Sequence, residues 1–240
     1  MSRTIGLIGG MSWESTAVYY KEINELVRDR RGGLASADLL LHSVNFDEIV
    51  AMQKAGRWDL AEQALADTAN GLVKAGAGCI LICTNTMHLV ADTVARAVPV
   101  PLLHIVDVVG HALVQAGMKK PLLLATRYTM EEDFYRDRMK ARFGLDTIVP
   151  DEADRAAVHD IIFDELCCGI IKETSRARYV EVIRKAAAQG ADCVILGCTE
   201  IGLLIDETDS PLPAFDSTKL HARAAVDFFD GSLEVETVAA

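Results

Sequence analysis

Two stretches of the chain repeat one another: KAGAGCILICTNT at residues 74–86 and AQGADCVILGCTE at residues 188–200. A constant offset of 114 residues aligns Cys79 with Cys193, and it sets Thr84 against Cys198. In both stretches a short apolar run, typical of a buried strand, ends in a small polar tetrad. A weaker echo, at an offset near 115, pairs residues 4–8 and the helix after them with residues 121–125 and their helix. Together the two matches indicate one internal duplication.

Short β-rich runs alternate with longer helical stretches along the whole chain, which is typical of parallel α/β sheets. The expected strands are residues 4–8, 38–44, 79–83, 101–105, 121–125, 146–149 and 192–196. The expected helices are residues 15–30, 60–74, 87–97, 108–116, 129–143, 154–166, 175–188 and 218–229. We therefore predict two pseudo-symmetric α/β domains, each a parallel sheet flanked by helices, with the active site in the cleft between them. The first domain is expected to comprise residues 1–105 and 212–240, and the second residues 106–211. Ligands of such sheets bind beyond the carboxyl ends of the strands, where Thr84 and Cys198 stand.

Composition excludes several classes of function. Hydrophobic residues make up 50% of the 240 residues and charged residues 25%, which is a globular composition. The net charge of -11 argues against nucleic acid or an anionic membrane as a partner, so an anionic substrate would need a locally positive site. No apolar run reaches the ~18 residues of a membrane-spanning helix. Six cysteines without a CxxC pair indicate reduced thiols in a cytoplasmic protein, and six histidines without ligand spacing predict no metal site.

The two polar tetrads, residues 83–86 and 197–200, suggest chemistry at the start of a helix. Backbone N–H groups of Asn85, Thr86 and Thr199 are placed to stabilise charge on a substrate carboxylate. A thiol at such a position is expected to have a lowered pKa, which makes Cys198 a candidate base. The alternative is that these residues only cap helices and that the cysteine is a small buried side chain.

The segments Cys83-Thr-Asn-Thr-Met-His88, Gly197-Cys-Thr-Glu-Ile-Gly202 and Ile8-Gly-Gly-Met-Ser-Trp-Glu14 resemble the aspartate/glutamate racemases that work without pyridoxal phosphate. The resemblance covers nearly the whole chain and is strongest to the L-aspartate/glutamate-specific and broad-specificity members. It implies two proton-transfer groups on opposite faces of the substrate α-carbon, no cofactor and a homodimer. It also implies substrate contacts from Met11, in a glycine-rich turn, and from Gln53.

Thr84 stands where the family usually has its first cysteine, as in the L-specific subgroup. Cys83 lies one residue earlier on the opposite face of the strand, so we expect a buried structural thiol there. A thiolate can abstract the α-proton near neutral pH, whereas an alcohol can only donate or relay a proton. The predicted catalytic pair is therefore Cys198, which abstracts, and Thr84, which delivers. Glu200 is expected to contact the substrate and orient the site, or else to stabilise a helix start.

Several questions stay open at this point. The cation that would hold a distal carboxylate is undecided among Lys172, Lys54 and Arg57. A broad-specificity amino-acid racemase, a single-cysteine decarboxylase or isomerase on the same scaffold, and a non-catalytic amino-acid-binding protein are the alternative functions.

Overall fold

The computed structural model describes residues 3–233 of the chain. Its contacts divide the chain into two compact units, which we call unit 1 and unit 2. Unit 1 runs up to His104 and resumes at His221, and unit 2 spans Ile105–Leu220. Each unit holds a three-stranded parallel sheet flanked by helices, which confirms the predicted α/β class. The domain limits of 105/106 and 211/212 stay a prediction. Over the described residues, none of the helices is both long and apolar enough to cross a membrane.

Unit 1 is built on a sheet in the order β2-β1-β3. Its strands are β1 (Ile5–Gly9), β2 (Leu39–Ser43) and β3 (Cys79–Ile82). Its helices are α1 (Trp13–Arg31), α2 (Phe46–Lys54), α3 (Trp58–Lys74), the 3-10 helix η1 (Thr86–Val90), α4 (Ala91–Ala97) and most of α11 (Ser217–Asp230).

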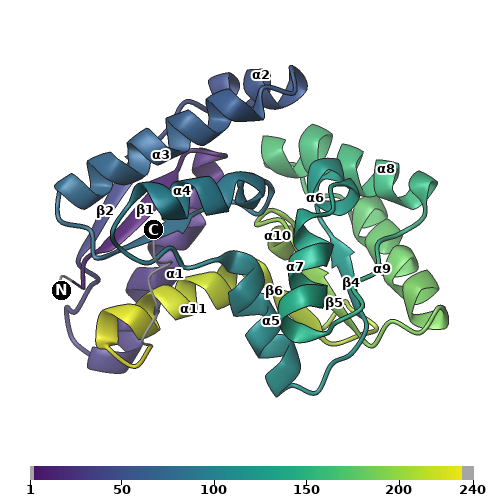
Figure 1. The fold of residues 1–240 in the computed structure, drawn as a ribbon. Coiled ribbons are helices and arrows are strands. Elements are labelled where there is room, and N and C mark those ends of the chain that lie inside the picture. Colours follow the sequence, from purple (N-terminus) through teal and green to yellow (C-terminus); the bar gives the residue numbers. More distant parts are fainter. Residues whose placement is uncertain (1–2, 234–240) are drawn as a thin grey trace. The chain divides into compact units, whose positions relative to one another are not determined.

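The two faces of this sheet are covered by different helices (Figure 1). Ile80 and Ile82 of β3 pack with α3 and α4, whereas Leu81 and the adjoining Cys83 pack with α1 and α11. This alternation follows from the two-residue period of a strand. Cys83 is fully buried, and burial raises the pKa of its thiol, which confirms that it is a structural cysteine.

Unit 2 has a sheet in the order β4-β5-β6, made of β4 (Pro121–Leu124), β5 (Cys193–Leu196) and β6 (Ala214–Asp216). Its helices are α5 (Ile105–Gln115), α6 (Arg127–Glu131), α7 (Phe134–Phe143), α8 (Glu152–Asp160), the π-helix η2 (Ile161–Glu165), the 3-10 helix η3 (Leu166–Cys168), α9 (Glu173–Ala188) and α10 (Ile201–Leu204). Apolar side chains of α5, α7, α8 and α9 form one continuous core with β4 and β5.

The strand registers of the two units match. In unit 1, Ile5 pairs with Cys79, and in unit 2 the corresponding pair is Pro121 with Cys193. On the other side of the same strands, Ile80 pairs with Leu102 and Val194 pairs with Ala214. The backbone bonds at the ends of β3 and β5 also correspond: Cys83 N–H donates to the Ile8 carbonyl at 2.9 Å, and Gly197 N–H to the Leu124 carbonyl at 2.7 Å. The duplication read from the sequence is therefore present in the backbone pairing itself.

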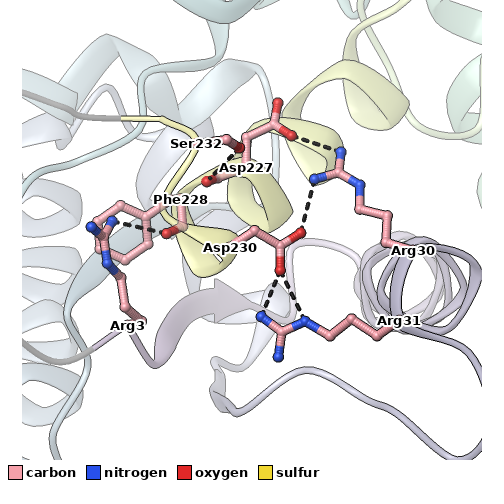
Figure 2. Close-up of polar contacts among 7 residues, drawn as sticks. All are labelled: Arg3, Arg30, Arg31, Asp227, Phe228, Asp230 and Ser232. Carbon is pink, nitrogen blue, oxygen red and sulfur yellow. Dashed lines mark hydrogen bonds and ion pairs between the residues drawn. The ribbon is translucent and has the colours of Figure 1, made fainter.

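Arginines at the end of α1 hold the end of α11 within unit 1 (Figure 2). Arg30 donates to Asp227 at 2.6 Å and to Asp230 at 3.0 Å, and Arg31 makes two bonds to Asp230, at 2.6 and 3.0 Å. A single exposed ion pair contributes only about 0–1 kcal/mol to stability. Two guanidinium groups that share a carboxylate restrict the orientation of the side chains more strongly than one pair does. The network fixes the last turns of α11.

Several expected elements differ in the structure. Residues 101–105 and 146–149 form only single bridges, at Leu102 and Ile148, and prolines at 101 and 150 limit their pairing. The expected helices 87–97, 129–143 and 154–166 are each divided into shorter helices. The strand β6 and the helices α2 and α10 were not expected. α2 has a recognisable start, because the Asn45 side chain accepts a hydrogen bond from the Asp47 N–H.

The duplication also relates two buried tyrosines, Tyr19 on α1 and Tyr135 on α7. They are 116 residues apart, as are the equivalent residues Ile5 of β1 and Pro121 of β4. Tyr19 Oη lies 2.9 Å from Nδ1 of His221 on α11. Leu102 and Ala214, which occupy equivalent places before α5 and α11, are 112 residues apart. By the same spacing, the residue of α5 that corresponds to His221 of α11 is Val109. Among the residues that the structure describes, Tyr135 Oη has no hydrogen-bond partner.

This contrast predicts opposite effects of one substitution at the two tyrosines. Tyr19→Phe removes the partner of a buried imidazole and is expected to destabilise the protein by about 1–3 kcal/mol. Tyr135→Phe removes an unsatisfied hydroxyl and is expected to be neutral or stabilising, because that group loses its hydration on folding without a compensating bond. Urea unfolding of both variants against the wild type measures the difference. Equal losses at both positions would contradict the assignment.

Candidate active site

Both polar tetrads begin where the chain leaves an equivalent strand, β3 in unit 1 and β5 in unit 2. After the last sheet bonds at Cys83 and Gly197, the next residues are Thr84 and Cys198, and both are partly exposed. The structure thus places the predicted catalytic pair at equivalent positions of the two units, at the carboxyl ends of β3 and β5.

In unit 1 the backbone of Thr84 is held on both sides. Its N–H donates to the Ile82 carbonyl at 2.9 Å, and its carbonyl accepts a bond from His88 Nδ1 at 2.8 Å. Asn85 and Thr86 are buried and begin η1, where the His88 N–H donates to the Asn85 carbonyl at 3.0 Å. The hydroxyl-bearing residue therefore has a fixed backbone and a partly exposed side chain.

In unit 2 the thiol of Cys198 donates to Oε2 of Glu200 at 2.9 Å. Burial and the neighbouring Glu200 carboxylate raise the pKa of the Cys198 thiol well above its ordinary value. The expectation of a lowered thiol pKa was therefore wrong. It assumed a helix N-terminus as the dominant field, but α10 has only four residues, and the carboxylate two positions on favours the protonated sulfur. Glu200 itself is buried, as is Thr199, which accepts a bond from Thr218 Oγ1 at 3.3 Å.

The glycine-rich turn after β1 lies in unit 1. Gly10 has a φ of 88°, and a Cβ there would stand 2.2 Å from the Val44 carbonyl oxygen, so only glycine fits. Met11, the next residue, is buried in the same apolar cluster as Met87. Gln53 of α2 is also buried, and its Nε2 donates to the Met87 sulfur at 3.1 Å. The structure thus brings Gln53 to η1, the helix that follows Thr84.

Comparison with known proteins shows the family to which the chain belongs. The sequence model of Asp/Glu/hydantoin racemases matches residues 8–225. The chain belongs to this family. A broad-specificity amino-acid racemase from Bacillus subtilis, RacX, is 25% identical over 94% of this chain and 97% of its own. A solved Yersinia pestis protein, provisionally assigned as an Asp/Glu racemase, is 51% identical with a TM-score of 0.89, over 95% of this chain and 99% of its own. An aspartate racemase homologue from Pyrococcus horikoshii is 35% identical with a TM-score of 0.85, over the same shares of the two chains.

Of the three candidate cations in this racemase-family chain, two are already paired. Arg57 lies 2.6 Å from Asp59, and Lys172 lies 3.0 Å from Oε1 of Glu165. The Glu165 carboxylate also accepts a bond from Ser175 Oγ at 2.5 Å. The side chains of Lys172 and Arg57 are equally exposed, at 52% and 53%, but their partners differ: Glu165 is only 17% exposed and is held by Ser175, whereas Asp59 is 62% exposed.

Sequence reasoning missed a group of histidines behind Thr84. His88, His104 and His221 are all buried in unit 1, with the rings of His88 and His104 4.6 Å apart and those of His88 and His221 5.8 Å apart. They come from three separate segments, so no spacing could reveal them together. The one available signal was His88, four residues after Thr84 in a helical segment. Across residues 3–233, no set of three or more histidine, cysteine or acidic side chains is arranged to hold a metal ion.

Proposed function

We propose that the protein is a cofactor-independent amino-acid racemase that inverts the α-carbon of L-aspartate or L-glutamate, with Cys198 as the base and Thr84 as the opposing proton donor. The observation that carries this proposal is the match in strand register, because equivalent positions of two duplicated units hold two different proton-transfer groups. Membership of a racemase family and the names of the relatives support the reaction class.

The bond between Cys198 and Glu200 suggests how a protonated thiol becomes a base. When the substrate's α-ammonium group binds, its charge favours the thiolate, and the Cys198 proton passes to Oε2 of Glu200 across 2.9 Å. The thiolate then takes the α-proton, which breaks the C–H bond and forms an S–H bond. In this proposal Glu200 accepts the thiol proton of Cys198, in addition to the substrate contact expected for Glu200.

Delivery on the other face falls to Thr84. Its hydroxyl gives a proton to the α-carbon and takes one from solvent, because an alkoxide is too basic to persist near neutral pH. The Glu200 proton returns to solvent, so the cycle ends where it began. Backbone N–H groups of Asn85, Thr86 and Thr199 are proposed to hold the substrate carboxylate while charge grows on it.

The distal carboxylate of the substrate needs a positive partner in a chain of net charge -11. We propose Lys172 for this contact, because its pairing with the anchored Glu165 gives it a defined position. Met11 and Gln53 are proposed to contact the substrate. A broad-specificity racemase is the second candidate, favoured by the near full-length match to RacX. A homodimer in the cytoplasm remains our expectation from the family resemblance and the free thiols.

Proton NMR in D₂O tests the reaction directly. We expect L-aspartate or L-glutamate to lose its α-proton signal and, by chiral chromatography, to reach an equal mixture of enantiomers. Activity should survive dialysis against a chelator and treatment with a carbonyl reagent, since neither a metal nor a carbonyl cofactor takes part. Loss of a carboxyl group would indicate a decarboxylase, and unchanged substrate would indicate a binding protein. Rapid turnover of neutral amino acids would favour broad specificity.

A further inference from the structure

The histidines behind Thr84 form an ordered array in which the direction of the hydrogen bonds can be read. His221 Nε2 lies 2.8 Å from the Leu103 carbonyl, which can only accept, so this nitrogen carries a proton. Burial lowers the pKa of His221 to about 4, so the ring is neutral near pH 7 and its Nδ1 accepts from the Tyr19 hydroxyl. The ring is therefore fixed from two sides.

His88 lies between this anchored ring and the tetrad. Its ring is edge-on to His221 at 5.8 Å and tilted against His104 at 4.6 Å. Its Nδ1 faces the Thr84 carbonyl at 2.8 Å, so Nδ1 bears the hydrogen. The side chain is buried, which limits the orientations it can adopt. A rigid donor thus holds the backbone of the residue that is proposed to deliver the proton.

Unit 2 holds the equivalent carbonyl with a backbone donor and not with a side chain: the Ile201 N–H donates to the Cys198 carbonyl at 3.1 Å. At the offset of 114, the equivalent of His88 is Gly202 on α10. A Cβ at Gly202 would stand 2.8 Å from Oδ2 of Asp216, so a larger residue there would need Asp216 to shift. In unit 2 the side chain of Glu200 accepts a hydrogen bond from the sulfur of Cys198 directly. The two units therefore support their proton-transfer residues in different ways. A side chain, His88, holds the carbonyl of Thr84, whereas the carbonyl of Cys198 is held by a backbone N–H and its sulfur by Glu200.

We propose that His88 is a positioning residue for proton delivery, and that its Nδ1–H fixes the direction of the Thr84 hydroxyl by holding the Thr84 carbonyl. This rests on the proposed function, since it concerns the second half of the inversion. Proton transfer depends steeply on the alignment of donor and acceptor, so a Thr84 backbone that can rotate delivers less often. Abstraction by Cys198 does not depend on this bond.

Two variants of similar size isolate the hydrogen bond. His88→Asn places an amide N–H near the position of Nδ1, and His88→Leu has almost the same shape without a donor. Each variant is incubated with the L-substrate in D₂O, and two rates are measured: formation of the D-enantiomer, and deuterium entry into recovered L-substrate. We expect His88→Leu to lower the ratio of inversion to exchange at least about tenfold, as expected from the loss of one aligned hydrogen bond, and His88→Asn to keep it within about threefold.

His221→Gln is the matched control, because it disturbs the same buried array without touching Thr84. It should lower stability but lower the ratio of inversion to exchange much less than His88→Leu does, because the bond from His88 to the Thr84 carbonyl remains. If His88→Leu and His88→Asn have the wild-type ratio while the wild type inverts its substrate, the positioning role is wrong and the proposed function stands. If His221→Gln lowered the ratio as much as His88→Leu does, the positioning role of His88 would also be wrong. A wild-type protein that neither exchanges nor inverts overturns both proposals.

Discussion

Replacement of Cys198 by alanine is expected to abolish both inversion and deuterium exchange at the substrate α-carbon, by a factor of at least about 10³. Cys198 is the only member of the proposed pair that can act as a base, so no exchange should begin from the L-enantiomer without it. Cys198→Ser should be nearly as inactive, because an alcohol does not ionise usefully near neutral pH. Chiral chromatography and α-proton NMR measure the two rates.

The control for this variant is Cys168→Ala, which removes an exposed thiol of the same unit and should leave both rates unchanged. Unfolding curves should show that Cys198→Ala is folded, because Cys198 is partly exposed and its loss leaves no large cavity. Inversion by Cys198→Ala within tenfold of the wild-type rate would remove this residue from the mechanism.

Replacement of Thr84 by alanine is expected to separate the two rates. Inversion should fall by about 10²–10³, while deuterium exchange into recovered L-substrate falls by less than about threefold, because abstraction survives and delivery does not. Thr84→Ser keeps the hydroxyl and should retain most of the inversion. An undiminished rate of inversion in Thr84→Ala would mean that water or another residue delivers the second proton.

A thermodynamic limit applies to any directional preference of this pair. Free enantiomers have equal free energy in achiral solvent, so kcat/KM must be equal in the two directions. A thiol on one face and an alcohol on the other can therefore make kcat and KM differ between the enantiomers only if both change together. Thr84→Cys should narrow the difference in kcat, because it supplies a second group that can ionise.

The main features of the fold could be predicted from the sequence because they repeat. The duplicated tetrads predicted two α/β units and the equivalence of Thr84 and Cys198 from the sequence alone. The expected strands at 101–105 and 146–149 were misleading, because an apolar run next to proline looks like a strand but pairs through only one residue. β6 was missed for the opposite reason: it has only three residues and no apolar periodicity to reveal it.

The electrostatics of the site could not be predicted in the same way. The pKa of Cys198 depends on where the Glu200 carboxylate turns, and a spacing of two residues does not determine that. The sequence left Gln53 open between a substrate contact and a solvated helix residue, and its burial depends on how α2 packs against η1. The contact between His88 and His104 joins a helix to a segment outside the sheet, so it exists only after tertiary folding.

The hydrogen bond from Cys198 to Glu200 also bears on how long the catalyst lasts. Peroxides and alkylating agents attack thiolates, and a cysteine that stays protonated between turnovers offers them very little of the reactive form. Most catalytic cysteines are poised as anions and must be shielded from oxidation by reductants or by their surroundings. Here the carboxylate that is proposed to take the proton during turnover would also keep the sulfur protonated between turnovers. The protein would then be most vulnerable to oxidation while it holds substrate and least so when it is empty.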